Sequence, residues 1–66
     1  MPIVNITLIE GRSDEDKERL MSKVTEAIVE SIGAPIQTVR VIINEVPAKH
    51  FSVGGMSKAA KKPVST

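Results

Sequence analysis

Apolar and polar residues alternate with a period of two over residues 3–9, which predicts a β-strand. One face of this strand is apolar throughout, and the other mixes isoleucines with polar residues. The apolar face consists of Val4, Ile6 and Leu8, and the mixed face of Ile3, Asn5, Thr7 and Ile9. The alternation ends at Glu10, and Gly11 then favours a turn.

The period of the pattern changes to three and four residues over positions 14–32, which predicts an amphipathic helix. Ser13 is a favourable N-cap, and the three acidic residues that follow it suit the positive end of a helix dipole. Gly33 suits the C-terminal cap, and Pro35 prevents the helix from continuing. The predicted apolar stripe consists of Leu20, Met21, Val24, Ala27, Ile28 and Ile32. The residues expected on the solvated face are Lys17, Glu18, Lys23, Glu26 and Glu30.

A second alternating segment, residues 39–46, predicts another strand. The helix of about 19 residues is long enough to return the chain for parallel pairing, and such crossovers are right-handed. After Pro47, alternating residues around Gly54-Gly55 predict a short hairpin or loop. The fold class is therefore α/β (α+β), a β-α-β unit with a short C-terminal hairpin. We expect one domain over 1–66, with 57–66 as a flexible tail.

The composition indicates that this unit is completed by other copies of itself. The chain has 66 residues, of which 41% are hydrophobic, and it has no cysteine to form a disulfide. Small scaffolds without disulfides or metals usually gain stability by oligomerisation. A two-stranded sheet with one helix also leaves a sheet face and its strand edges uncovered. We therefore expect a homo-oligomer.

Charge and residue types exclude several other classes of protein. The net charge is +1 and the only aromatic residue is a phenylalanine, which argues against a nucleic-acid-binding domain. No apolar run approaches ~20 residues, and no signal-peptide layout precedes the first strand. A lone histidine and scattered carboxylates do not have metal-ligand spacing. We expect no nucleic acid, membrane, metal or cofactor, and a cytoplasmic location.

Pro2 is the candidate for chemistry at the start of the chain. Methionine is usually trimmed before a residue as small as proline, which would leave Pro2 with a free secondary amine. An α-amino group titrates near pH ~7.7–8.0, much closer to neutrality than a lysine does. Pro2 would then be a base at the tip of a strand. If Met1 is retained, the Pro2 nitrogen is an amide and cannot accept a proton.

Strand geometry separates Pro2 from Arg12, the nearest candidate for binding an anion. The two residues lie at opposite ends of the first strand, roughly 30 Å apart at ~3.3 Å per residue. They cannot act on one small molecule within one subunit. If two copies of the first strand pair antiparallel about a two-fold axis, Pro2 of one chain lies beside Arg12 of the other. The result would be a four-stranded sheet with the two first strands at its centre.

Four segments follow one another in a recognisable order: Pro2-Ile3, residues 8–15 (Leu-Ile-Glu-Gly-Arg-Ser-Asp-Glu), residues 39–43 (Val-Arg-Val-Ile-Ile) and residues 50–55 (His-Phe-Ser-Val-Gly-Gly). Together they resemble the 4-oxalocrotonate tautomerases. The resemblance covers residues 2 to about 55, and the tail from Met56 onward departs from the pattern. Each segment alone is weak, but all four with matching spacing are specific at the level of the family.

The resemblance implies an isomerase that assembles from dimers, most often as a hexamer, and acts on a small enol or dienol acid. It implies that Pro2 is the general base, that Arg12 and Arg40 handle substrate oxygens, and that Phe51 lines the pocket. The family also contains dehalogenases and a decarboxylase, so the natural substrate stays open.

The chemistry of these residue types agrees with those roles. A neutral amine can take a proton from a dienol hydroxyl and deliver it to a carbon further along the conjugated chain. Apolar walls from Ile9 and Phe51, with guanidinium groups nearby, disfavour the ammonium form of Pro2 and are expected to lower its pKa. Arginine pairs two-pronged with a carboxylate, which suits a dicarboxylate such as 2-hydroxymuconate.

Other interpretations of these residues remain open. The two arginines can be exposed ion-pairing residues, and Phe51 can be a packing residue. His50, Glu10 and Glu45 are alternative bases, but each lies in a loop or at a strand end, where we expect exposure to solvent. A non-catalytic oligomeric scaffold of the same fold is the alternative from another class.

Overall fold

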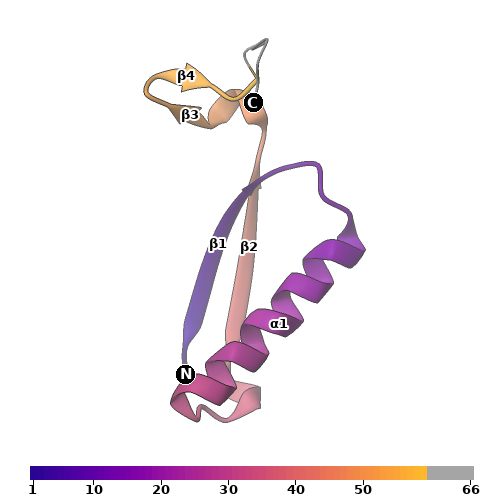
Figure 1. The fold of residues 1–66 in the computed structure, drawn as a ribbon, viewed down its shortest axis with the longest axis vertical. Coiled ribbons are helices and arrows are strands. Elements are labelled where there is room, and N and C mark those ends of the chain that lie inside the picture. The colour runs from indigo at the N-terminus through magenta and orange to yellow at the C-terminus, as the bar shows by residue number, and fades with distance from the viewer. Residues whose placement is uncertain (60–66) are drawn as a thin grey trace.

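The computed structural model describes residues 1–59 and contains one helix between two longer strands, followed by a small hairpin (Figure 1). The elements are β1 (Ile3–Ile9), α1 (Asp14–Ile32), η1 (Ile36–Thr38), β2 (Arg40–Val46), η2 (Ala48–His50), β3 (Ser52–Val53) and β4 (Met56–Ser57). This order confirms the predicted β-α-β unit with a C-terminal hairpin.

β1 and β2 form a parallel pair whose two faces differ in their environment. Ile3 lies opposite Arg40 and Ile9 opposite Val46, so the two strands are in register over their full length. The half-buried positions of the face packed against α1 are Val4, Ile6, Leu8, Val41 and Ile43. The exposed positions of the other face are Ile3, Asn5, Thr7, Arg40, Ile42 and Asn44. The alternation seen in the sequence therefore separates a covered face from an uncovered one.

The helix begins and ends where the capping residues predict. The Ser13 hydroxyl accepts a hydrogen bond from the backbone N–H of Asp16 at 3.0 Å, as an N-cap does. At the other end Gly33 adopts φ 70°, and its N–H donates to the Val29 carbonyl at 3.0 Å. The second strand starts at Arg40 rather than at the predicted residue 39. The N–H of Val39 instead closes η1 by donating to the Ile36 carbonyl at 3.2 Å.

The predicted apolar stripe of α1 is correct at its centre and wrong at its border. Ala27 and Ile32 were placed in the stripe but are exposed, whereas Thr25 and Val29 are half-buried. Lys17, assigned to the solvated face, is also half-buried. A sheet of only two strands is narrower than the apolar stripe, so it covers one side of the stripe and leaves the other side in solvent.

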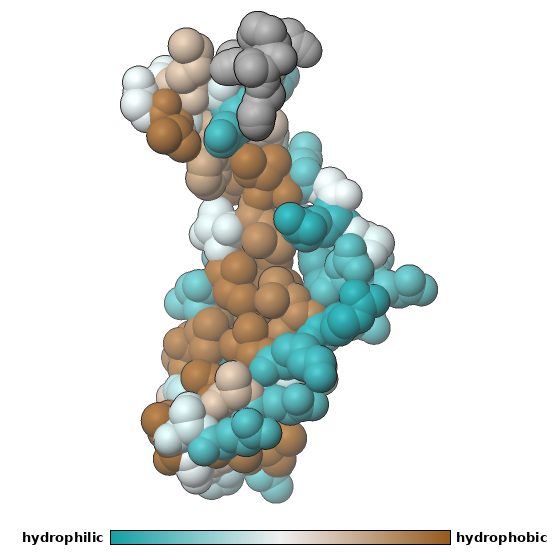
Figure 2. Space-filling model, in the orientation of Figure 1, coloured by the Kyte–Doolittle hydropathy of each residue, from teal (hydrophilic) through white to brown (hydrophobic). Residues whose placement is uncertain are grey.

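The chain does not enclose a core of its own. No hydrophobic side chain of residues 1–59 is fully buried. The radius of gyration is 15.2 Å, whereas a compact domain of this length would have about 11 Å. The large apolar residues left exposed are Met1, Ile3, Ile32, Ile36, Ile42, Val53 and Met56. Apolar atoms accordingly form a broad uncovered band along the strands, beside the polar outer surface of α1 (Figure 2).

The hairpin of β3 and β4 stands away from α1, at the end of the molecule opposite the N-terminus (Figure 1). Gly54 and Gly55 turn the chain with φ of 64° and 84°, which a side chain at either position would strain. Val53 pairs with Met56 across the hairpin, and both are more than half exposed, at 62% and 58%. The hairpin therefore presents these two apolar side chains to solvent.

The expected flexible tail, 57–66, begins inside this hairpin. Ser57 belongs to β4, and the backbone N–H of Lys58 donates to the Phe51 carbonyl at 2.7 Å. Residues 60–66 lie outside the described part of the chain. Among residues 1–59, α1 is too polar and too short in apolar run to cross a membrane, and no other helix is long enough.

Candidate active site

Pro2 and Arg40 lie side by side at the start of the strand pair. The backbone N–H of Arg40 donates to the Pro2 carbonyl at 3.0 Å, which is the first hydrogen bond between the two chain segments. The Arg40 guanidinium donates through Nη1 to the Gln37 carbonyl at 3.2 Å, and its side chain is exposed. Parallel pairing thus brings together one predicted base and one predicted anion-binding residue.

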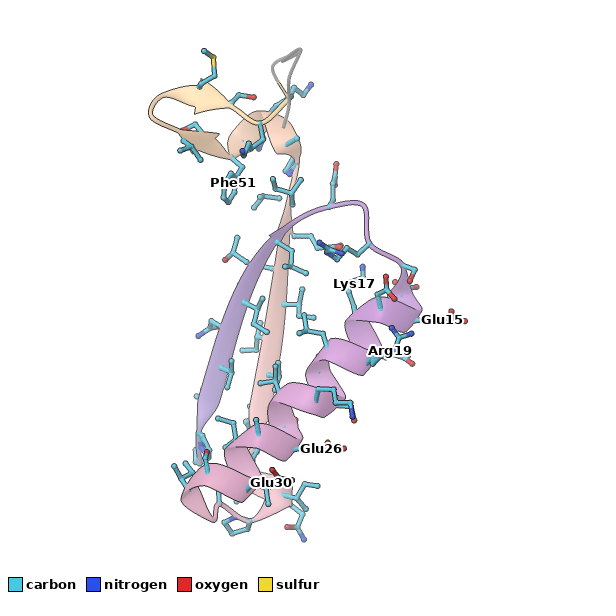
Figure 3. All side chains as sticks on the ribbon, in the orientation of Figure 1. Glu15, Lys17, Arg19, Glu26, Glu30 and Phe51 are labelled. Atoms are coloured by element: carbon cyan, nitrogen blue, oxygen red, sulfur yellow. The ribbon has the colours of Figure 1, made fainter. Side chains whose placement is uncertain are left out.

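Ile9, Arg12 and Phe51 belong to the opposite end of the strand pair. Ile9 is the last residue of β1 and lies opposite Val46, the last residue of β2. Arg12 lies in the loop between β1 and α1. Phe51 follows β2 after η2, at the base of the hairpin (Figure 3). Phe51 is half-buried, and its carbonyl is held by the N–H of Lys58.

The two groups are separated by the length of β1. Six residue steps from Ile3 to Ile9 at ~3.3 Å correspond to about 20 Å, and Arg12 lies beyond that end. One chain therefore presents Pro2 and Arg40 at one end and Arg12, with Ile9 and Phe51, at the other. No small dicarboxylate spans both groups within one copy.

Arg12 opens onto a groove of about 470 Å³ between β1 and the first half of α1. The residues that line it are Leu8, Arg12, Asp16, Lys17, Arg19, Leu20 and Lys23. The three basic residues of α1 that line the groove all have carboxylate partners. Arg19 pairs with Asp16 at 2.9 Å and Lys23 with Glu26 at 3.8 Å. Lys17 pairs with both Asp14 and Glu45, at 3.4 Å and 2.9 Å. Within residues 1–59, Arg12 has no carboxylate within 4.0 Å, so its guanidinium can receive an anion from outside the chain.

Lys17 and Glu45 form an ion pair that the sequence interpretation missed. It placed Lys17 on the solvated face of the helix and did not pair it with Glu45. Lys17 Nζ donates to Glu45 Oε2 at 2.9 Å and also lies 3.4 Å from Asp14 Oδ1. The hydrogen bond to Glu45 raises the pKa of Lys17 above its ordinary value. The side chain points from the first turn of α1 toward the strands (Figure 3).

The spacing of apolar residues in the sequence could have predicted that Lys17 and Glu45 face each other. Glu45 has the same phase along β2 as Val41 and Ile43, so it faces α1. Lys17 precedes Met21 by four residues, so it lies on the face of α1 that packs against the sheet. The three alternative bases, Glu10, Glu45 and His50, are all exposed as predicted.

The comparisons with known proteins identify the family. A family model described as "Tautomerase enzyme" matches residues 2–61. The chain belongs to the tautomerase family. The match extends past residue 55, where the resemblance seen in the four sequence segments ends.

Similar proteins place this tautomerase among the 4-oxalocrotonate tautomerases. The 2-hydroxymuconate tautomerase of Stutzerimonas stutzeri is 55% identical over 60 residues, which cover 91% of this chain and 95% of that protein. The solved structure of a heterohexamer 4-oxalocrotonate tautomerase from Chloroflexus aurantiacus has a TM-score of 0.90 and 40% identity, covering 94% of this chain and 100% of that chain. A homologue from the tomaymycin biosynthetic pathway has a TM-score of 0.87 and 41% identity, covering 88% and 89%.

These findings confirm the resemblance, the fold class and the enzyme class predicted from the sequence. The tautomerase is an enzyme of the isomerase class, similar to proteins that are named for the tautomerisation of 2-hydroxymuconate.

Proposed function

We propose that this tautomerase converts a 2-hydroxydienoate, a dicarboxylate like 2-hydroxymuconate, into its keto isomer with Pro2 as the general base. The neutral Pro2 amine takes the proton of the 2-hydroxyl group and returns it to a carbon further along the conjugated chain. The 2-oxygen becomes a carbonyl oxygen, and no other reactant is consumed. The observation that supports this most is the division of the predicted site residues between the two ends of one strand pair.

Division of the site requires a second copy of the chain. Antiparallel pairing of β1 with its symmetry mate about a two-fold axis brings Pro2 and Arg40 of one subunit beside Arg12, Ile9 and Phe51 of the partner. The sheet then has four strands, and its uncovered face and the apolar hairpins remain for contacts between dimers. We infer a hexamer built from three such dimers, in agreement with the hexameric state named for the relative from Chloroflexus aurantiacus.

Each residue then has a role that follows from its chemistry. The two arginines divide the anionic groups of the substrate, with one binding a carboxylate and the other steadying charge that develops on the 2-oxygen. Ile9 and Phe51 supply apolar walls, which lower the pKa of a buried amine and keep Pro2 neutral at the operating pH. Pro2 can both accept and donate a proton efficiently only when its pKa is close to the operating pH.

The decisive experiment compares processed protein, which begins at Pro2, with protein of the same sequence that retains Met1. Met1 is 67% exposed, so its peptide bond is accessible to an aminopeptidase. Both forms are identified by intact mass, matched for oligomeric state by sedimentation, and assayed by the change in absorbance of 2-hydroxymuconate. We expect Met1 retention to reduce kcat/KM by at least about 100-fold, because an amide has no basic lone pair.

The pH profile of the processed form supplies a second test. Its kcat/KM should fall at acidic pH, since protonation of Pro2 removes the lone pair. Equal activity of the two forms would show that the base is another residue. Absence of activity in both, with the oligomer intact, would favour a different substrate class or a non-catalytic scaffold.

A further inference from the structure

Both ends of the loop that carries Arg12 are attached to two neighbouring residues of β2. On the β1 side, the N–H of Glu10 donates to the Val46 carbonyl at 2.9 Å. On the α1 side, Lys17 Nζ donates to Glu45 Oε2 at 2.9 Å. Arg12 lies between these two attachments, so its position is defined relative to the end of β2.

The attachment through Lys17 reaches the loop by a short covalent and hydrogen-bonded path. Lys17 is in the first turn of α1, and its backbone N–H donates to the Ser13 carbonyl at 3.1 Å. Ser13 is the N-cap of α1 and directly follows Arg12. A displacement of this turn from β2 would therefore move the Arg12 backbone with it.

The loop has few packing contacts that could fix its position without these two attachments. Gly11 adopts φ 132°, and a Cβ at this position would meet no atom of the described chain within 4 Å other than its own neighbours. Arg12 itself is exposed and has no ion pair within residues 1–59. The loop thus depends on its two ends for its position.

The Lys17–Glu45 pair differs from the other ion pairs of residues 1–59. Those pairs join residues three apart on α1, whereas Lys17 and Glu45 are 28 residues apart and join α1 to β2. The Lys17 side chain is 19% exposed and that of Glu45 31%, compared with 72% for Lys23. A partly buried pair is screened less by water and salt than an exposed one.

We propose that Lys17 is a positioning residue for Arg12, and that its bridge to Glu45 holds the arginine where substrate binding requires it. This inference rests on the proposed function, because Arg12 must contact the substrate for its position to affect the kinetics. Lys17 acts through the loop, and it does not contact the substrate itself.

The primary test is K17M, which keeps the apolar stem of the side chain and removes the ammonium group. We expect kcat/KM on 2-hydroxymuconate to fall by about tenfold, since a displacement of about 1 Å at a binding group has large kinetic effects. K17R restores a cation and should recover most of the activity. E45Q keeps the size and an acceptor oxygen of the partner, and should give a smaller loss.

The matched control is E26Q, on the same helix. It breaks the ion pair between Lys23 Nζ and Glu26 Oε1 at 3.8 Å, whose partners are both on α1, and Glu26 does not line the groove beside Arg12. Activity of E26Q should equal that of the original protein. A similar loss in E26Q would mean that the loss of any ion pair of α1 explains the K17M result, and would overturn the inference.

A double-mutant cycle with R12A separates positioning from a general structural effect. In the R12A background, K17M should cause little further loss, and the acid limb of the pH profile should be unchanged in K17M because Pro2 is untouched. The inference would be overturned if K17M caused a tenfold loss both with and without R12A. It would also be overturned if the kinetics were unchanged in K17M, in E45Q and in the K17M/E45Q double variant. If R12A alone left the kinetics unchanged, the proposed role of Arg12 would fail first, and the inference with it.

Discussion

At the start of the strand pair, Pro2 and Arg40 are joined by a main-chain hydrogen bond, whereas at its other end Arg12 depends on a side-chain bridge between α1 and β2. The first arrangement needs no particular side chain, because parallel pairing places the two backbones next to each other. The second depends on the identity of Lys17 and Glu45. One end is therefore robust to substitution, and the other is sensitive to it.

This difference agrees with the tasks proposed for the two ends. A base at a chain terminus needs a backbone that stays in one place, and strand pairing supplies that. An arginine that binds an anion needs a guanidinium with no partner of its own, and a loop with Gly11 leaves Arg12 unpaired within residues 1–59. The bridge through Lys17 limits the mobility that such a loop would otherwise have.

The proposed division of tasks between the Pro2 end and the Arg12 end of the strand pair is tested most strongly by mixing subunits that are defective at opposite ends. Chains that retain Met1 and chains with R12A should each be poorly active alone. After co-refolding, random pairing yields mixed dimers in which one of the two sites has an intact Pro2 and an intact Arg12 from different chains. Activity should then rise to about a quarter of that of the original protein.

The control for this experiment is to mix the two proteins without refolding, so that no subunits exchange. Activity should stay at the average of the two components. If co-refolded mixed oligomers, verified by native mass, were no more active than that average, Pro2 and Arg12 of one site would come from the same chain.

Replacing the arginines one at a time gives the next largest effect. R12A and R40A should each lower kcat/KM by about tenfold or more, because a charge-assisted contact to a substrate oxygen is lost in each. Far-ultraviolet circular dichroism should be unchanged, since both side chains are exposed and neither is in an ion pair within the described chain. Unchanged kinetics in both variants would mean that they are ordinary surface arginines.

The parts of the fold that could be predicted from the sequence are those set by local chemistry. Ser13 and Gly33 define the ends of α1, and the alternation in β1 and β2 defines which side chains lie toward α1. These features depend on residues close together in the chain, so periodicity and capping preferences are sufficient to find them.

The parts that could not be predicted depend on the width and twist of the packed elements. Ile32 belongs to the apolar stripe by spacing, yet it is exposed because the sheet has only two strands. The bridge from Lys17 to Glu45 crosses 28 residues, and nothing in the composition of either segment pairs them. The separation of Pro2 from Arg12, by contrast, could be predicted from the length of the first strand.

The smallest predicted effect concerns the pH dependence of the bridge at the Arg12 end. The hydrogen bond to Glu45 raises the pKa of Lys17, so the folded protein holds this proton more tightly than the unfolded chain does. The stabilisation is therefore complete below the unfolded value, about 10.4, and is lost as pH rises through the higher folded value. The measurement is the coupling between K17M and E45Q, obtained from urea unfolding of both single variants and the double variant. The coupling should be constant from about pH 7 to 9 and should shrink once the pH rises above the unfolded value. A coupling that was already zero at neutral pH would show that Lys17 and Glu45 do not hold α1 to β2, and the two ends of the strand pair would then not differ as described.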